Sequence, residues 1–544
     1  MKDYKIYIYL PLVLALAIAA GIFIGSRYNV SSVNSKVFGL GFSKFNKLND
    51  ILNYVLEEYV DSVDRDELID GSLSAVLKEL DPHSAYIPPR NLSAINEPLE
   101  GNFEGIGIEF RIISDTVVVL NAMEGGPSRA LGIEAGDRII KIDGHSVAGV
   151  GIVNKEVVNV LRGGRGTRVD ISIHRRGTTS LIDYEITRGS IPIRSVVIAY
   201  MITPNIGYIK INRFSAKTYE EYLTAFKSLP ASKLEGMIID LRSNPGGYLS
   251  ASTSLADEFL PDRRLIVYTE GKSQPKHPYF ATEIGGFEEG RLVVLIDRNS
   301  ASASEIVAGA LQDNDRGTII GRRSFGKGLV QRQYPFPDGS AIRLTIARYY
   351  TPTGRCIQRP YDQGLAEYYY QMYQRDNEES GVVDSSLFAD SLRYTTPLGK
   401  VVYGGGGIMP DIVVEVDTLG ASAYLDALMN HRLLSRFAFD YTDRHRHDLL
   451  SYEDYRILDR HLMDSEDVMK EFIAFADAND VAFDQAGFET SRQRIEMWLK
   501  AYVADNLWSN KGMLPILHKY DHDVRKAIEV LNEQGASTIA EITE

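Results

Sequence analysis

Apolar runs alternate with amphipathic stretches through the middle of the chain, from residue 191 to 416. The runs at 206–212 and 292–296 have the length and the β-branched content of buried strands. Between them, residues 216–229 carry apolar side chains at helical spacing. Strands that alternate with helices predict an α/β core, which binds its ligands at the C-terminal ends of the strands.

The pattern differs on both sides of this region, and it predicts five parts. Residues 31–95 have the periodicity of amphipathic helices, whereas residues 96–190 consist of short strand-like runs separated by glycine turns. The last part returns to helical periodicity. The predicted parts are an N-terminal tip with a membrane anchor (1–30), a helical segment (31–95), a β-rich domain (96–190), the α/β core (191–416) and a C-terminal helical extension (417–544).

Three residues of the C-terminal extension, Ser451, Ser465 and Thr490, stand ahead of helical runs and are predicted helix caps. Its sequence leaves three roles open. The extension packs on the core, makes a homo-oligomer, or binds an adaptor.

The N-terminus contains one long apolar segment. Lys5 and Arg27 bracket 21 uncharged residues, enough to span a hydrocarbon core of about 30 Å. Lys2 and Lys5 precede the segment, which favours a cytoplasmic N-terminus and export of the rest of the chain. A cleaved signal peptide is the alternative, with a cleavage site near residues 17–19. However, the apolar run continues beyond these residues. We therefore expect a single uncleaved anchor, with the bulk in the periplasm or otherwise outside the cytoplasmic membrane.

Composition narrows the class of protein. The chain has 544 residues, of which 44% are hydrophobic and 24% charged, as in a globular protein of several domains. A net charge of −14 argues against nucleic acid as a partner, because nucleic acid requires a basic face. The single cysteine, Cys356, excludes an intrachain disulfide framework and a multi-cysteine metal site.

Candidate chemistry concentrates after the strand predicted at 292–296. That strand ends in a run of alternating serine and alanine, and a helical stretch begins near Ser304. A second strand-like piece, 317–321, ends in a turn that presents Lys327 between two glycines, and Gln331 follows four residues later. A serine at a strand-to-helix turn lies beside unpaired N–H groups, which can hold an oxyanion. A lysine that burial keeps neutral can activate such a serine.

Two other interpretations fit parts of this stretch. Ser302 and Glu305 have the spacing of a capping box, so that Ser302 would only cap a helix. The spacing from Gly321 to Lys327 is close to that of a phosphate-binding P-loop. However, Gly328 stands where a P-loop needs Ser or Thr, and the following residues do not predict a helix.

The stretch resembles the core of the carboxyl-terminal processing (tail-specific) proteases, which use a Ser-Lys dyad. The family pattern S-A-S-E-I is present at 302–306, and F-G-K-G-x-V-Q is present at 325–331. By this resemblance, Ser302 is the nucleophile, Lys327 the general base, and Gln331 a residue that orients the lysine. The family's serine-to-lysine spacing selects Ser302 among the three neighbouring serines.

Further segments carry the same resemblance. Residues 81–86, DPHSAY, match the family's N-terminal segment, in which the histidine has no part in chemistry. Residues 240–247, DLRSNPGG, match the family's D-L-R-x-N-x-G-G, and a loop with two glycines can turn free N–H groups inward. Gly246 or Gly247, together with Ala303, is therefore the candidate oxyanion hole, unless the loop is an ordinary tight turn. The resemblance also implies a crotonase-like, spiral form for the protease core.

The β-rich part resembles a PDZ domain. In such domains a peptide pairs with a strand edge, and a glycine-containing loop receives its terminal carboxylate. Here Gly105, Ile106, Gly107 and Ile108 form the candidate loop and strand start. Arg162 either favours the carboxylate or couples this domain to the active site, unless it is a solvated surface residue.

The sequence thus predicts a membrane-anchored, extracytoplasmic serine endopeptidase. Its fold would be an α/β crotonase-like core with an inserted PDZ domain and helical segments at both ends. Its substrates would be proteins or peptides with accessible C-terminal tails, and it would need no metal or cofactor. The alternatives are a catalytically silent PDZ scaffold that binds tails and, less favoured, a nucleotide-binding protein.

Overall fold

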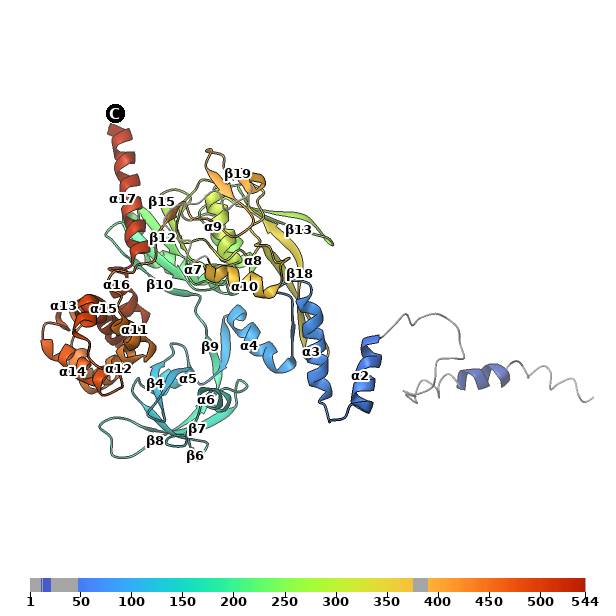
Figure 1. Ribbon diagram of the computed structural model, residues 1–544, viewed down its shortest axis with the longest axis horizontal. Helices are drawn as coiled ribbons and strands as arrows, with labels where there is room; N and C mark the ends of the chain where they lie inside the picture. Colours follow the sequence, from blue (N-terminus) through green and yellow to red (C-terminus); the bar gives the residue numbers. More distant parts are fainter. Residues whose placement is uncertain (1–10, 12, 21–46, 375–389, 544) are drawn as a thin grey trace, which may run out of the picture. The chain divides into compact units, whose positions relative to one another are not determined.

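The computed structural model describes residues 11, 13–20, 47–374 and 390–543 (Figure 1). The chain divides into two compact units at residues 73 and 74. The first unit contains helix α2 (Lys47–Glu58), and helix α3 (Arg65–Lys78) includes the boundary between the units.

The predicted membrane segment lies mostly outside the described residues. Residues 11 and 13–20 are described, and they are helical. In the described part of the chain, no helix combines the length and the apolarity that a membrane crossing requires.

A six-stranded sheet forms the centre of the α/β core. Its first strand runs antiparallel to the second, and the remaining strands run parallel. In sheet order the strands are β10 (Val196–Met201), β11 (Ile206–Ile211), β12 (Gly236–Asp240), β15 (Arg291–Ile296), β16 (Thr318–Gly321) and β21 (Ile412–Val413).

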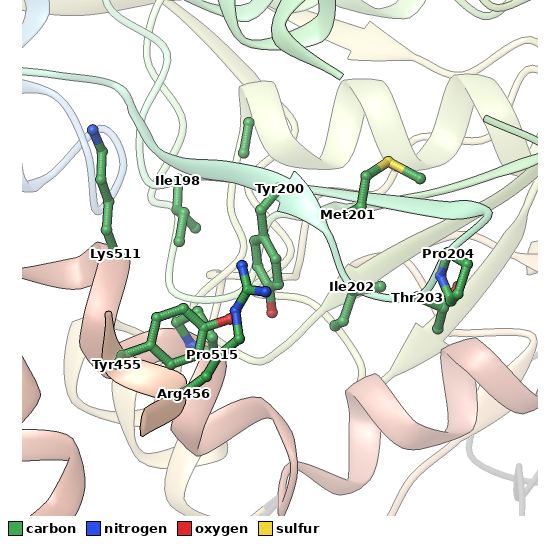
Figure 2. A pocket seen from close by; sticks show the side chains of 11 residues that line it. Ile198, Tyr200, Met201, Ile202, Thr203, Pro204, Tyr455, Arg456, Lys511 and Pro515 are labelled. Carbon is green, nitrogen blue, oxygen red and sulfur yellow. The ribbon is translucent and has the colours of Figure 1, made fainter. Parts of the chain in front are cut away.

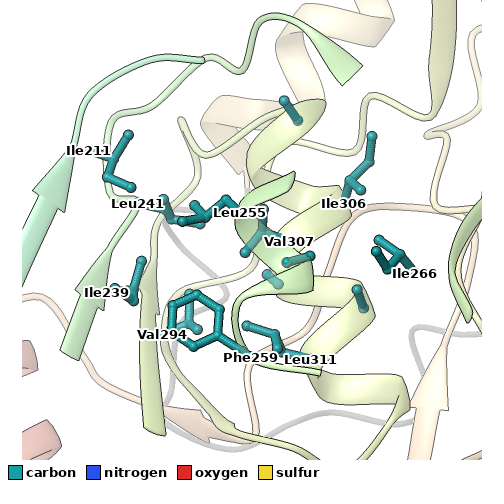
Figure 3. Packing of buried hydrophobic residues seen from close by; sticks show 14 of the residues in the cluster. Ile211, Ile239, Leu241, Leu255, Phe259, Ile266, Val294, Ile306, Val307 and Leu311 are labelled. Carbon is teal, nitrogen blue, oxygen red and sulfur yellow. The ribbon is translucent and has the colours of Figure 1, made fainter. Parts of the chain in front are cut away.

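Helices cover both faces of this sheet, so its strands carry apolar side chains on both faces. Ile239 and Val294 point into a cluster with α7 (Thr218–Ser228), α8 (Leu249–Asp257) and α9 (Ala303–Asp313) (Figure 3). Their neighbours Ile238 and Val293 belong to a cluster on the other face, with α17 (His522–Thr543). Because successive side chains point to opposite faces, the central residues of these strands are apolar on both faces.

A second, antiparallel sheet completes the core. The hairpin of β17 and β18 forms its centre, with Asp338 in the turn, where its carboxylate accepts a hydrogen bond from the Ser340 N–H at 2.9 Å. The strands of this sheet are β1 (Ala85–Ile87), β18 (Ala341–Tyr350), β13 (Leu265–Gly271) and β14 (Gln274–Phe280) in order, with β17 (Leu329–Pro335) also paired to β18. Smaller elements of the core are η1 (Ala231–Lys233), α10 (Leu365–Gln374), η4 (Asp390–Leu392), β19 (Arg393–Thr395) and β20 (Val401–Tyr403).

The β-rich domain is inserted ahead of the core and has its own apolar cluster. Helix α4 (Pro89–Glu100) and the antiparallel pair β2 (Asn102–Gly105) and β9 (Gly189–Pro192) flank it. Its sheet contains β3 (Ile108–Ile113), β4 (Thr116–Ala122), β5 (Arg138–Ile142), β7 (Arg168–His174) and β8 (Ile182–Thr187) in order, and β6 (His145–Ser146) pairs with β5. Helices α5 (Pro127–Ala130) and α6 (Asn154–Leu161) complete it. Strand β3 thus lies at the sheet edge.

The C-terminal extension is helical, and its last helix packs on the core sheet. Ser465 caps α14, where its hydroxyl accepts the N–H of Asp467 at 3.1 Å. The predictions of Ser451 and Thr490 as caps were wrong, because Asp454 caps α13 and Asp484 caps α15. The helices before α17 are α11 (Ala423–Asn430), α12 (Leu433–Leu449), α13 (Tyr455–His461), α14 (Glu466–Asp477), α15 (Gln485–Trp508) and α16 (Asn510–His518).

These elements confirm the predicted fold class. An α/β core carries an inserted β-rich domain, and helical segments stand at both ends of the chain. The arrangement is consistent with the crotonase-like form that the family resemblance implied.

Candidate active site

Ser302 lies in the turn between β15 and α9, at the carboxyl end of the core sheet. Its backbone has φ 54° and ψ −110°, a sparsely populated conformation for a residue with a side chain. Such strain costs about 1–3 kcal/mol and persists only when the surroundings enforce it. Here the N–H of Ala301 donates to the carbonyl of Asn244 at 3.0 Å, and the N–H of Ser302 donates to the carboxylate of Glu305 at 2.7 Å.

Glu305 joins the serine turn to the lysine loop. Its side chain is fully buried on α9. Besides the Ser302 N–H, the carboxylate accepts the N–H groups of Gly326 at 2.7 Å and Lys327 at 2.9 Å, and the hydroxyl of Ser324 at 2.6 Å. Burial raises the pKa of Glu305 to about 7, whereas the hydroxyl and the three N–H groups act in the opposite direction. The site is thus built to receive the charged form, because all four partners are donors.

The Lys327 side chain is held by Gln331, which stands on β17. The Lys327 amine donates to Oε1 of Gln331 at 2.9 Å, and Nε2 of Gln331 donates to the backbone carbonyl of His83 at 2.5 Å. An amine and a carbonyl on either side fix which way the amide points. The segment DPHSAY therefore reaches the site through a backbone group, while the His83 ring contacts Phe325 and Tyr368.

Lys327 is half-buried, and its environment favours the neutral amine. Burial lowers the pKa of Lys327 to about 8, and the positive charge of Arg343 adds to this effect. Among the described residues, the amine and the Ser302 hydroxyl make no hydrogen bond to each other. Catalytic contacts are often long before a substrate binds.

Tyr349 makes a second link between the two halves of the site. Its buried hydroxyl lies within hydrogen-bonding distance of two backbone carbonyls, those of Ser302 (3.1 Å) and Lys327. Burial raises the pKa of Tyr349 well above its ordinary value, so that the phenol keeps its proton as a donor.

The loop DLRSNPGG lies against the serine turn. A Cβ atom on Gly246 would come within 2.8 Å of the Cβ of Ser302 and 2.9 Å of the N of Ala303. A Cβ on Gly247 would come within 1.9 Å of the carbonyl oxygen of Phe214. Both positions therefore require glycine, and the close approach brings this loop and Ser302 together.

The N–H groups of the loop differ in their partners. The N–H of Gly246 donates to the buried side chain of Asn244 at 2.9 Å. Within the described residues, the N–H groups of Gly247 and Ala303 donate to no other group. Asn244 also donates to the carbonyl of Ile211 at 2.9 Å, which ties the loop to β11.

The predicted PDZ residues also lie together. Gly105 ends β2, Ile106 is buried, Gly107 has φ 75° and Ile108 starts the edge strand β3. Arg162 follows α6 and pairs with Glu97 on α4 at 2.6 Å, with its guanidinium 4.9 Å from the ring centroid of Phe103. Arg162 thus connects the peptide-groove helix to the segment that precedes the domain.

Sequence reasoning missed three residues that hold the site. Glu305 was visible as half of a capping box and as the glutamate of the S-A-S-E-I pattern, and Asn244 only as the asparagine of the D-L-R-x-N motif, but neither was given a role in the site. Tyr349 begins a segment, 349–358, that resembles the family, but nothing in it gave the tyrosine a role in the site. The P-loop interpretation was wrong, because Gly328 leads into strand β17 and not into a helix. Among the described residues, no group of three or more His, Cys, Asp or Glu side chains is arranged to hold a metal ion.

Comparisons with known proteins identify the families of the two central domains. A model of peptidase family S41 matches residues 205–366, and a PDZ-domain model matches residues 105–186. A model of a family of unknown function matches residues 424–509, within the C-terminal helices. A solved structure of the photosystem II D1 C-terminal processing protease covers 69% of this chain and 88% of that chain, with 26% identity and a TM-score of 0.36.

Two curated relatives share more of the sequence. The carboxy-terminal-processing protease of Bartonella bacilliformis is 37% identical over 346 residues, which cover 62% of this chain and 79% of that protein. The carboxy-terminal processing protease CtpA of Bacillus subtilis is 32% identical over 364 residues, 66% of this chain and 76% of that protein. The chain belongs to the carboxy-terminal processing protease family and is a serine-type peptidase with a PDZ domain.

The contacts of Glu305 generate the first prediction. Glu305→Gln keeps the shape of the side chain but replaces one oxygen by an NH₂ group, which then faces backbone donors. We expect a loss of unfolding free energy of about 2–4 kcal/mol, the cost of leaving buried donors unpaired, and a fall in kcat/KM of at least about tenfold, since 1.4 kcal/mol is tenfold. Urea unfolding and peptide hydrolysis measure the two effects.

The matched control is Glu235→Gln. Glu235 is 64% exposed and pairs with Arg291 at the surface, so its change should cost less than about 1 kcal/mol. Equal behaviour of the two variants would contradict the role given to Glu305.

Proposed function

We propose that the protein is a membrane-anchored, extracytoplasmic endopeptidase that binds C-terminal tails in its PDZ groove and cuts the chain with Ser302 and Lys327. The observation that carries the proposal is the environment of Lys327. Its half-buried amine has a lowered pKa, one N–H is taken by Gln331, and its loop is bonded through Glu305 to the Ser302 turn.

Lys327 acts as the general base in this proposal. With one N–H donated to Gln331, the lone pair of the neutral amine is left to take the proton of the Ser302 hydroxyl. The Ser302 oxygen then attacks the scissile carbonyl, and the amine returns its proton to the leaving nitrogen. Water enters, gives a proton to the amine and releases the acyl group from Ser302.

Ser302 is favoured as nucleophile over its two serine neighbours. Ser300 donates its hydroxyl to the carbonyl of Leu241 at 2.8 Å, and Ser304 donates to that of Asn244 at 2.9 Å. Both are fully buried, whereas Ser302 is half-buried. Only Ser302 therefore combines partial exposure with a hydroxyl that is not committed to a backbone carbonyl.

The oxyanion is held by the N–H groups of Gly247 and Ala303. Gly246 is the weaker choice of the two glycines, because its N–H is bonded to Asn244. Neither N–H group would have to break an existing hydrogen bond to bind the oxyanion. The two can therefore stabilise the tetrahedral intermediate without reorganisation.

The PDZ domain receives the substrate's tail. The edge strand β3 offers its backbone for pairing, and the loop of Gly105, Ile106 and Gly107 offers N–H groups to the terminal carboxylate. Residues 1–30 hold the enzyme in the membrane. This part of the proposal rests on the length and apolarity of the segment between Lys5 and Arg27, and on the positive charges before it.

The dyad predicts the pH dependence of hydrolysis. Because only the neutral amine accepts a proton, kcat/KM should rise with pH and level off above about 8, falling about tenfold per unit below it. Gln331→Glu places a carboxylate beside the amine, which stabilises the ammonium form and moves the inflection to higher pH by about one unit. A fluorogenic peptide assayed from pH 6 to 10 measures both profiles.

Lys327→Met should remove activity by orders of magnitude, whereas Lys526→Met, at an exposed pair with Glu529 on α17, should not change it. An inflection that stays in place in Gln331→Glu, or a profile that is flat down to pH 6, would rule out Lys327 as the base.

The tail-binding role predicts a dependence on the terminal carboxylate. A peptide with a free C-terminus should bind Ser302→Ala protein about tenfold more tightly than the same peptide with a C-terminal amide. The amidated peptide has no terminal carboxylate and therefore loses one set of charge-assisted hydrogen bonds. Fluorescence anisotropy measures the two affinities. Equal affinities would show that the groove does not read the carboxylate.

The anchor predicts where the protein fractionates. The full chain should stay in the membrane pellet after carbonate extraction, whereas residues 31–544 should be found in the supernatant. N-terminal sequencing of the exported protein provides the control. A mature N-terminus just after residue 19 would mean that a signal peptide is removed.

A further inference from the structure

Strand β10 presents one unpaired edge of the core sheet. It stands at the end of the strand order and, among the strands of the described residues, pairs only with β11. The N–H of Ile202 donates to the carbonyl of Ile206 at 3.0 Å, which sets the alternation along the strand. Ile198 and Tyr200 therefore point their backbone groups at β11, and Ala199 and Met201 point theirs outward.

A cavity of about 670 Å³ runs along this edge (Figure 2). Strand β10 and the turn after it form one wall, and helices α13 and α16 of the C-terminal extension form the other. Figure 2 shows Tyr455 and Arg456 facing the strand from below, with Lys511 beside them. The lining residues are Ile198, Ala199, Tyr200, Met201, Ile202, Thr203, Pro204, Tyr455, Arg456, Lys511 and Pro515.

The charged residues of this lining are both cationic, although the chain as a whole carries a net charge of −14. Lys511 is exposed, and within the described residues it has no ion-pair partner. Nε of Arg456 lies 3.6 Å from Oδ2 of Asp454, and the two side chains are 69% and 44% exposed. Such an exposed ion pair is weak. The lining contains no carboxylate.

We propose that this groove binds an extended acidic segment of a partner protein. Unpaired strand edges recruit another strand, and the outward N–H and C=O groups of Ala199 and Met201 repeat at the spacing that an added strand matches. Arg456 and Lys511 select acidic side chains on that segment. The site is separate from the PDZ groove, and it does not depend on the proposed proteolytic mechanism.

The test uses the full chain with Ser302→Ala, so that the probe is not cleaved. The probe is a labelled peptide of six Glu-Val repeats with acetylated and amidated ends, which the PDZ carboxylate loop cannot recognise by its terminus. Anisotropy should give a dissociation constant of about 10–100 μM, typical of a small interface. A Lys-Val peptide of the same length should not bind.

Two variants examine the two kinds of contact. The pair Arg456→Glu and Lys511→Glu reverses the charge of the groove, and Met201→Pro removes one outward N–H while leaving the bonds to β11. Each should weaken binding at least about tenfold. The matched control, Lys227→Glu with Lys233→Glu, reverses two exposed charges elsewhere on the core and should leave binding unchanged.

The proposal is overturned if the Glu-Val peptide does not bind at 1 mM, if the Lys-Val peptide binds equally well, or if charge reversal in the groove has no effect. If Met201→Pro does not fold, the charge-reversal variant decides. Sedimentation provides a further outcome. Self-association of the chain that the groove variants abolish would make a second copy the occupant, and would also overturn the proposal.

Discussion

The candidate active site depends on one fully buried carboxylate, that of Glu305. Removing a carboxylate from water is costly, and the cost is offset here by the four hydrogen bonds that the carboxylate accepts. Three of the donors are backbone N–H groups of two loops that are far apart in sequence. The charge of Glu305 therefore fixes the positions of Ser302 and Lys327 relative to each other, because it binds the backbone of both.

Other buried polar side chains also position the loops of the candidate site through hydrogen bonds. Buried amides and hydroxyls, and not apolar contacts, hold the backbone of Ser302 and Lys327. Asn244 ties the glycine loop to the serine turn, and Tyr349 bridges the carbonyls on either side of the dyad. The side chains of Asn244 and Tyr349 are buried, where a hydrogen bond is strong and a missing one is costly. This network is what allows Ser302 to keep a strained backbone.

Much of the fold could be predicted from the sequence because burial on both faces leaves a clear signal in parallel strands. The sequence could also indicate the candidate catalytic residues, since Ser302, Lys327 and Gln331 stand in short local motifs. The choice between Gly246 and Gly247 could not be predicted. It depends on which backbone N–H the Asn244 side chain accepts in the folded loop. The prediction of Thr490 as a helix cap was wrong because α15 begins earlier, with Asp484 as its cap. Both residue types suit a cap, so local propensity does not decide between them. The hydrogen bonds from Gly326 and Lys327 to Glu305 join residues that are 21 and 22 positions apart. Hydrophobic periodicity does not predict such long-range pairings.

The most direct test of this account is to find the atom that becomes acylated. The protein is treated with an organophosphonate that reacts with activated serines, digested, and mapped by mass spectrometry. We expect one adduct, on Ser302, which disappears in Lys327→Met while that variant stays folded. An adduct on Ser300 or Ser304, or peptide hydrolysis that continues in Ser302→Ala, would contradict it.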